Sequence, residues 1–414
     1  MVTKYDVFEA VYTNRHAIKP IEVAKKFKKN EREYDNIHRL LTELTQESLL
    51  AKTSSGFQAK KTENSNLLYE IIYHCLQNDI NYNELLNLGI AKFVSRALQK
   101  KEIILKDVNL HPVTFRKYID ILYKNGLLLI ISEKPLKVKV FYNILLNNLL
   151  VYFGYKHKVI TEDTTNYLED IEKELTKFRR LKRENEIKYQ QIINEFEISF
   201  IHHSLALEGN PLTLNETKRI LKDKIIPANL KSEDIDEVKN YQKALLQMLK
   251  DSRDKNPLTL ETILYYHFLA MEHNPNIAGK IRKIEVHILG NPNFKITKTE
   301  NIGKELEELI RKYNDFIKKE KVPLKEILNF AVYFHNEFQH IHPFEDGNSR
   351  TTRLVTFHLL QSKDIPILDI PFGLLDEYLG YTKAARVRED AKLFSNLQKI
   401  ILFNLKKINE KLSQ

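Results

Sequence analysis

The sequence has a single cysteine among its 414 residues. Cys75 therefore has no partner for an internal disulfide, and this usage fits a reducing compartment. A long hydrophobic run is also missing, because the most apolar piece, Ile144–Phe153, is too short to span a bilayer and is interrupted by Asn147 and Asn148. Residues 1–6 contain no apolar signal segment. These absences predict a cytoplasmic protein that does not enter a membrane.

Positively charged residues only slightly outnumber negatively charged ones. The chain has 65 Lys and Arg against 55 Asp and Glu, a net charge of +10. This balance is a weak argument for acidic or nucleic-acid partners. A hydrophobic share of 43% is ample for folded cores, and the length predicts two or three domains.

The segment from His342 to Arg353 carries the strongest chemical signal in the chain. It combines a potential proton acceptor, the acid Asp346, a Gly-Asn-Ser turn and two arginines. Arg350 and Arg353 are three residues apart, so on a helix they lie on one face. A small-residue turn that enters a helix presents free backbone N–H groups to anions. The segment therefore predicts a polyphosphate site with His342 as the base.

This segment resembles the signature of Fic-domain proteins, His-Pro-Phe-x-(Asp/Glu)-Gly-Asn-Gly-Arg-x-x-Arg. The one departure is Ser349, where the family usually has its second glycine, and serine restricts positive φ. The resemblance implies transfer of AMP from ATP to a Tyr, Thr or Ser hydroxyl of a target protein or of the chain itself. It also implies His342 as the catalytic base and Asp346 as the ligand of Mg²⁺.

The resemblance assigns further residues to the nucleotide. Arg350 would contact the β-phosphate and Arg353 the γ-phosphate, whereas Arg386 departs from the asparagine usual in the family. The complete set that it assigns to ATP binding is Ile288, Leu289, Gly290, Asp346, Gly347, Asn348, Ser349, Arg350, Arg353, Tyr378 and Arg386.

A second motif lies upstream, at Ser204–Asn210. It resembles the inhibitory pattern (Ser/Thr)-x-x-x-Glu-(Gly/Asn) of Fic proteins in which the inhibitor and the catalytic domain share one chain. A Glu208 carboxylate paired with Arg353 would prevent that arginine from holding the γ-phosphate. The alternative is an ordinary helix end capped by Gly209. Together with the His342 segment, the motif favours inhibition through Ser204 and Glu208.

The first third of the chain repeats one pattern. A short helix at 20–27, a longer helix at 34–44 and a hairpin at 49–60 form the first copy. The second copy has a helix at 113–122 and a hairpin at 127–141. Each copy resembles a winged helix.

Basic residues near the two candidate recognition helices are Lys28, Lys29, Arg32, Arg39, Arg116 and Lys117. Such positions meet phosphates when a helix enters a major groove. However, the first helix also carries acidic residues, and winged helices often dock proteins. DNA binding and protein docking or dimerisation both stay open.

The remainder reads as nearly all helix, apart from a predicted hairpin at 283–296 around Gly-Asn-Pro. This hairpin stands where the resembled family has its flap, which clamps a target protein by strand addition. The predicted fold is mainly α, a Fic-type helical core with a hairpin flap that follows winged-helix-like modules. The predicted domains are winged-helix-like domains at 1–62 and 63–155, a helical connector at 156–194, and a Fic domain with its inhibitory helix at 195–414.

The leading hypothesis is an auto-inhibited protein adenylyltransferase. Removal of AMP, with Glu208 orienting a water, uses the same residues and is an alternative. A third hypothesis, from a different class, is a DNA-binding transcription regulator with a nucleotide-sensing core. Self-modification and homo-oligomer formation are further expectations.

Overall fold

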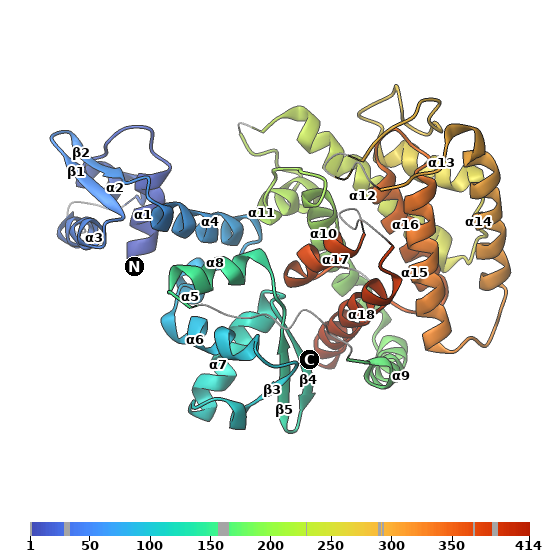
Figure 1. Cartoon of the computed structure of the whole chain (residues 1–414), viewed down its shortest axis with the longest axis horizontal. Helices are drawn as coiled ribbons and strands as arrows, with labels where there is room; N and C mark the ends of the chain where they lie inside the picture. Colours follow the sequence, from blue (N-terminus) through green and yellow to red (C-terminus); the bar gives the residue numbers. More distant parts are fainter. Residues whose placement is uncertain are drawn as a thin grey trace. The chain divides into compact units, whose positions relative to one another are not determined.

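The computed structural model of the protein describes residues 2–28, 34–155, 165–228, 230–288, 291, 294–366, 369–382 and 388–414. The fold is mainly helical with small hairpins, as predicted (Figure 1). The chain divides into two compact units, one comprising Met1–Asn125 with Tyr142–Ile160 and the other Gly126–Phe141 with Thr161–Gln414. Among the described helices, none combines the length and the apolar character that crossing a bilayer requires.

The first unit contains the helix, helix and hairpin that the sequence predicts. Its elements are α1 (Lys4–Tyr12), α2 (Pro20–Lys26), α3 (Tyr34–Gln46), β1 (Leu50–Thr53), β2 (Gly56–Ala59), α4 (Glu63–Gln77), α5 (Tyr82–Leu85), α6 (Leu88–Ala97), β3 (Ile103–Ile104), α7 (Pro112–Lys124) and α8 (Ile144–Tyr152). Capping boxes at Thr3 and Thr62 start α1 and α4. Pro20 and Pro112 occupy first helical positions, where the missing N–H has no cost.

The second unit carries the predicted catalytic residues. Its elements are β4 (Leu128–Glu133), β5 (Leu136–Val140), α9 (Leu168–Glu184), α10 (Glu186–Ala206), α11 (Leu214–Lys218), α12 (Ser232–Arg253), α13 (Leu260–Ala270), α14 (Ile302–Ile317), α15 (Leu324–Ile341), α16 (Asn348–Ser362), α17 (Leu375–Tyr381) and α18 (Asp390–Ser413), with a π-helical turn at Arg219–Asp223 and short 3₁₀ turns at Thr299–Asn301 and Phe372–Leu374.

Helix α16 is the centre of this unit. Nearly all of its side chains are buried, because α12, α13 and α15 pack around it (Figure 1). A helix that is buried on every side usually has an apolar sequence. Since α16 instead carries Arg350 and Arg353, these charges need partners inside the protein.

The β4–β5 hairpin packs within the second unit, against α18. Leu128 pairs with Val140 in the antiparallel register. Lys406 Nζ donates to the carbonyl of Ile131 at 3.1 Å, and the rings of Phe141 and Phe403 lie 6.4 Å apart. A hairpin from the first third of the sequence is therefore part of the unit that holds the C-terminal helices.

The predicted flap hairpin is not formed in the described part of 283–296, where no residue is in a strand. Arg282 explains the local conformation, since its buried side chain takes up carbonyls that a ladder would use. Its Nη1 donates to Ile284 O at 3.0 Å and its Nη2 donates to Thr297 O. Alternation of apolar and polar residues in 283–296 predicted two paired strands. In the structure, the carbonyls of Ile284 and Thr297 instead accept hydrogen bonds from the side chain of Arg282.

Candidate active site

His342 lies directly after α15, in a left-handed conformation with φ +48°. Its backbone N–H still donates to Phe338 O at 3.0 Å, so the helix holds it firmly. The ring Nδ1 lies 3.3 Å from the carbonyl oxygen of Gln339. Because a carbonyl only accepts, this contact favours the tautomer with the proton on Nδ1 and the lone pair on Nε2. That tautomer suits a general base.

Hydrogen bonds and a buried ring hold the loop after His342 in place. Asn348 accepts from Phe344 N at 2.9 Å and donates to Phe344 O at 2.8 Å. Phe344 is fully buried and stacks on His267 with ring centroids 3.7 Å apart. Gly347 has φ +79°, and a Cβ there would lie 2.9 Å from Met271 Sδ. The turn therefore requires glycine at this position.

His267 is a supporting residue that the sequence did not reveal. Its Nδ1 accepts from Gly279 N and its Nε2 donates to Asp346 O, both at 2.9 Å. Burial lowers the pKa of His267 to about 4, so the ring is neutral and can both donate and accept. His267 thus fixes the backbone of the loop that holds the predicted magnesium ligand.

The first turn of α16 is the place where the sequence predicts an anion site. Gly347 is its N-cap residue and has no side chain to occupy the first backbone N–H groups. Ser349 is helical and is not among the residues with positive φ. Serine in place of the usual glycine therefore causes no backbone strain here.

Arg350 is buried and paired on two sides. Its Nη1 contacts Glu237 Oε1 on α12, and its Nη2 lies 2.9 Å from Asp346 Oδ2. Glu237 also accepts from Asn210 Nδ2 at 2.7 Å. Glu237 was not predicted, because its place 113 residues before Arg350 gives no local signal.

Arg353 is held by both predicted inhibitory residues. Its Nη2 lies 2.9 Å from Glu208 Oε1 and also donates to Ser204 O at 2.9 Å, while its Nε donates to Ser204 Oγ at 2.6 Å. Burial lowers the pKa of Arg353, but Glu208, Tyr241 and Tyr378 together outweigh burial and the pKa is raised. The guanidinium thus stays charged inside the protein.

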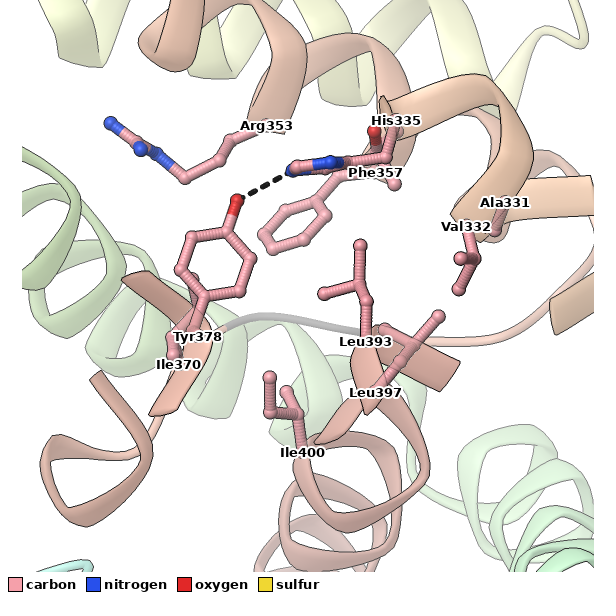
Figure 2. Close-up of a pocket in the computed structure, with 11 residues that line it drawn as sticks. Ala331, Val332, His335, Arg353, Phe357, Ile370, Tyr378, Leu393, Leu397 and Ile400 are labelled. Carbon is pink, nitrogen blue, oxygen red and sulfur yellow. Dashed lines mark hydrogen bonds between the residues drawn. The ribbon is translucent and has the colours of Figure 1, made fainter. Parts of the chain in front are cut away.

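Tyr378 and His335 also lie near Arg353 (Figure 2). The Tyr378 hydroxyl is 2.7 Å from His335 Nε2. Burial raises the pKa of Tyr378 to about 12, although the positive charge of Arg353 opposes this rise. A small cavity adjoins these three residues; its apolar lining comes from Ala331, Val332, Phe357, Ile370, Leu393, Leu397 and Ile400. His342 does not line this cavity.

The structure also joins the start of the flap segment to His342. Arg282 Nε donates to His342 O at 2.7 Å, and Arg282 N donates to Pro343 O at 2.9 Å. Ile288 is buried. Three residues predicted to bind ATP, Leu289, Gly290 and Arg386, lie outside the described residues.

Residues 257–360 match the Fic/DOC family. This segment, about a quarter of the chain, is similar to Fic/DOC domains. This confirms the resemblance that the His342 segment indicated. The Fic domain supplies α13 to α16 and the loop between α15 and α16, which includes His342, Asp346, Arg350 and Arg353.

Relatives of the Fic domain extend the match. The proteins named protein adenylyltransferase Fic of Drosophila erecta and Drosophila willistoni are 27% identical over 190 residues and 28% identical over 186 residues. Each alignment covers 45% of this chain but only 36% of the relative. A solved Fic domain containing signaling protein from Bacteroides thetaiotaomicron has a TM-score of 0.52 at 21% identity, and the match covers 60% of this chain and 98% of that one. This last likeness supports the fold alone.

Proposed function

We propose that this chain is a protein adenylyltransferase that its own Glu208 holds inactive. The observation that carries the proposal is the contact of Arg353 with Glu208 and Ser204, one helical turn from Arg350 and beside the loop of His342. An arginine that is already paired in this way is not available to a γ-phosphate. The name protein adenylyltransferase Fic, borne by the relatives, supports the reaction class.

In the proposed reaction, a hydroxyl oxygen of the target attacks the α-phosphorus of ATP. The Nε2 of His342 takes the proton of that hydroxyl, the bond between the α-phosphorus and the bridging oxygen breaks, and pyrophosphate leaves. The N–H groups at the start of α16 bind the phosphate oxygens, and Arg350 joins them when it exchanges its contact with the exposed Asp346 for phosphate. Arg353 holds the γ-phosphate once Glu208 has withdrawn, so that the α-phosphorus faces His342.

The residues present fit a magnesium ion. Asp346 offers a carboxylate that is 64% exposed, beside the proposed phosphate site. Its Oδ1 accepts from Gly347 N at 2.6 Å, which fixes the carboxylate on the loop. Mg²⁺ is usually bound by one or two carboxylates together with substrate phosphates and water. When bound, the ion supplies charge compensation for the leaving pyrophosphate.

The target protein is proposed to dock along the segment that follows Arg282. The described residues 283–288 are loop and belong to no strand. Arg282 ties this segment to the carbonyl of His342. A target strand laid beside it would bring a hydroxyl toward His342.

The proposed role of the first unit is protein docking. The two arginines on its candidate recognition helices have local partners, Arg39 with Glu43 at 3.5 Å and Arg116 with Asp120 at 2.9 Å. Val113, at the start of α7, is 71% exposed. An apolar residue at this position favours a protein partner. A shift of random duplex DNA at low salt that disappears steeply with added salt would contradict docking and favour DNA binding.

The test is incubation of the full chain with ATP and Mg²⁺, followed by intact mass measurement of the chain and of candidate targets. Glu208→Gly is expected to add AMP to protein far faster than wild type. His342→Ala in that background should lower the rate about 10²–10⁴-fold. Equal labelling by wild type and Glu208→Gly would contradict the inhibitory role of Glu208. Undiminished labelling by the His342→Ala variant would contradict the catalytic role of His342.

A further inference from the structure

Arg282 is a buried cation that reaches three separate segments around His342. Its side chain has an exposed fraction of 0%. Its Nε donates to His342 O at 2.7 Å, directly after α15. Its Nη1 donates to Ile284 O at 3.0 Å, and its Nη2 donates to Thr297 O. These three carbonyls belong to different parts of the chain, so one side chain joins them.

The docking segment after Arg282 has two described limbs, an outgoing limb at 283–288 and a return limb at 294–299. Glu285 links them, because its Oε1 accepts from Thr299 N at 2.9 Å and from Thr299 Oγ1 at 2.8 Å. Its Oε2 lies 3.4 Å from Arg282 Nη1. Arg282 and Glu285 together therefore hold the two limbs to each other.

The return limb is also fastened to α15, two residues before His342. Thr297 N donates to His340 O at 2.9 Å. His340 Nδ1 lies 2.9 Å from Lys295 O, and because a carbonyl only accepts, this nitrogen donates. The His340 ring stacks on Phe294 with centroids 4.4 Å apart. The end of α15 thus carries both the predicted base and the return limb.

His342 is held at both of its peptide groups. Its N–H donates to Phe338 O within α15, and its carbonyl accepts from the Arg282 side chain. The next carbonyl, that of Pro343, accepts from Arg282 N at 2.9 Å. A residue other than glycine keeps a left-handed conformation, such as φ +48° at His342, only where its surroundings hold it. The Arg282 side chain is part of those surroundings.

A guanidinium suits this role because it is planar and rigid. Its N–H groups point in fixed directions, so the oxygens that accept from them are fixed relative to one another. A lysine ammonium carries the same charge on a flexible stem and sets no such geometry. Glu285 is a carboxylate partner, but it is 55% exposed and 3.4 Å away, so the uncharged carbonyls make the closer contacts. Direction therefore matters here more than charge.

We propose that Arg282 is a positioning residue that fixes His342 and both limbs of the docking segment in one arrangement. The inference rests on the proposed function, in which His342 takes the proton of a target hydroxyl and the target lies along 283–288. The base and the segment that presents the hydroxyl then keep a constant separation. A misplacement of about 1 Å between reacting groups can lower a rate about 10²-fold.

The experiment compares Arg282→Met, Arg282→Lys and Glu285→Ala in the full chain, with Glu208→Gly as the parent. Hydrogen exchange measured by mass spectrometry without nucleotide reports how firmly the limbs and residues 338–346 are held. Arg282→Met should raise exchange about tenfold in both places, and Arg282→Lys should come close to it. Glu285→Ala should raise exchange in the limbs alone, since Arg282 still holds His342.

The rate of AMP transfer gives a second readout. Incorporation of AMP from radiolabelled ATP into the chain itself, at saturating ATP, should fall about 10²-fold in Arg282→Met and nearly as far in Arg282→Lys. The KM for ATP should change less than about threefold. Among the described residues, the hydrogen-bond partners of Arg282 do not include Arg350 or Arg353, which are proposed to bind the phosphates.

The matched control is Lys406→Met. Lys406 is also a mostly buried cation of the second unit, and its Nζ donates to Ile131 O at 3.1 Å and lies 3.4 Å from Glu174 Oε1. It therefore loses a carbonyl and a carboxylate partner, as Arg282→Met does. This variant should match the parent in the exchange of 338–346 and in transfer. An equal change in Lys406→Met would overturn the inference.

Other outcomes separate the inference from the proposed function. Parental exchange of 338–346 in folded Arg282→Met overturns the inference, and if that variant does not fold, parental exchange and rate in Arg282→Lys do so. A rise in the KM for ATP as large as the fall in rate overturns it too, because Arg282 would then act on nucleotide binding. A parent that transfers no AMP contradicts the proposed function, whereas the exchange of 338–346 still decides whether Arg282 holds His342.

Discussion

Arg350 and Arg353 lie one turn apart on α16 and are both almost fully buried, but the carboxylates that hold them come from different kinds of structure. Glu237, the partner of Arg350, is within the 22-residue helix α12. Glu208, the partner of Arg353, follows the end of α10 and precedes Gly209, which has φ +97°. A Cβ on Gly209 would meet no atom within 4 Å. The comparison shows one arginine held from within a long helix and the other from a turn that follows a helix end.

The largest expected effect separates the two carboxylates by activity. Glu208→Gly should raise AMP transfer on the order of 10²-fold, since it frees an arginine from a buried ion pair. Glu237→Gln should not activate, because Arg350 keeps Asp346 and the inhibitory contact remains intact. Rates of transfer from radiolabelled ATP test both variants side by side. Activation of similar size in both would abolish the distinction between the two arginines.

The next effect concerns α10 and pH. Glu197, on this helix, is 8% exposed, and burial raises its pKa to about 7, although Arg253 lowers it. Its folded pKa exceeds the unfolded value, so its stabilising effect is complete below about pH 4 and is lost as the pH rises through 7. Between pH 4.5 and 8, the unfolding free energy of wild type should fall by about 3 kcal/mol more than that of Glu197→Gln.

Denaturant unfolding at the two pH values measures this difference. Parallel pH profiles for wild type and Glu197→Gln would show that the carboxyl is not destabilised by burial. The stability of α10, the helix that precedes Glu208, would then depend no more on pH than that of α12, which carries Glu237.

A smaller effect should come from Ser204, whose hydroxyl accepts from Arg353 and donates to Tyr241 at 2.8 Å. Ser204→Ala removes one bond of the inhibitory contact and leaves Glu208 in place. Transfer should rise about fivefold, corresponding to about 1 kcal/mol. Ser199→Ala is the control, because Ser199 lies on the same helix and bonds only weakly to Glu195 O at 3.5 Å. Equal rates for the two variants would count against the role of Ser204.

The smallest effect tests whether the turn that carries Glu208 is coupled to Glu237, the partner of Arg350. Asn210 follows the inhibitory turn and donates to Glu237 Oε2 and, at 3.2 Å, to Asp234 O. Asn210→Ala should loosen the turn and raise transfer about twofold, as expected for the loss of a partly exposed hydrogen bond. The same change in the Glu208→Gly background should have no effect. An additive increase there would mean that Asn210 acts on Arg350 alone.

The sequence predicted those parts of the site that are contiguous along the chain. The loop from His342 to Arg353 and the pair Ser204 and Glu208 are local patterns, and their residues lie together as expected. Helix α16 begins directly after the Gly-Asn-Ser turn of the motif because Gly347, its N-cap residue, takes the left-handed conformation there. The two helix-and-hairpin patterns of the first third were also found, since periodicity and turn residues specify such elements locally.

Supporting residues were missed because their roles depend on tertiary packing. Glu237, His267 and Arg282 come from other segments and are recognisable only once those segments surround the loop. The described residues of the predicted flap hairpin are in no strand, and Arg282 bonds to the carbonyls of Ile284 and Thr297, which alternation of apolar and polar residues does not reveal. Residues that pair across helices, such as Glu237 with Arg350, therefore cannot be found from a motif of consecutive residues.

The placement of β4 and β5 against α18 has a practical consequence for truncation. A fragment that began after residue 165 would retain all the predicted catalytic residues but lack the hairpin that covers Phe403 and receives Lys406. It would also lose Gly126, whose carbonyl accepts from Gly373 N at 3.0 Å. Such a fragment would expose an aromatic surface of its last helix and tend to aggregate, so recombinant versions should retain the chain from before Gly126.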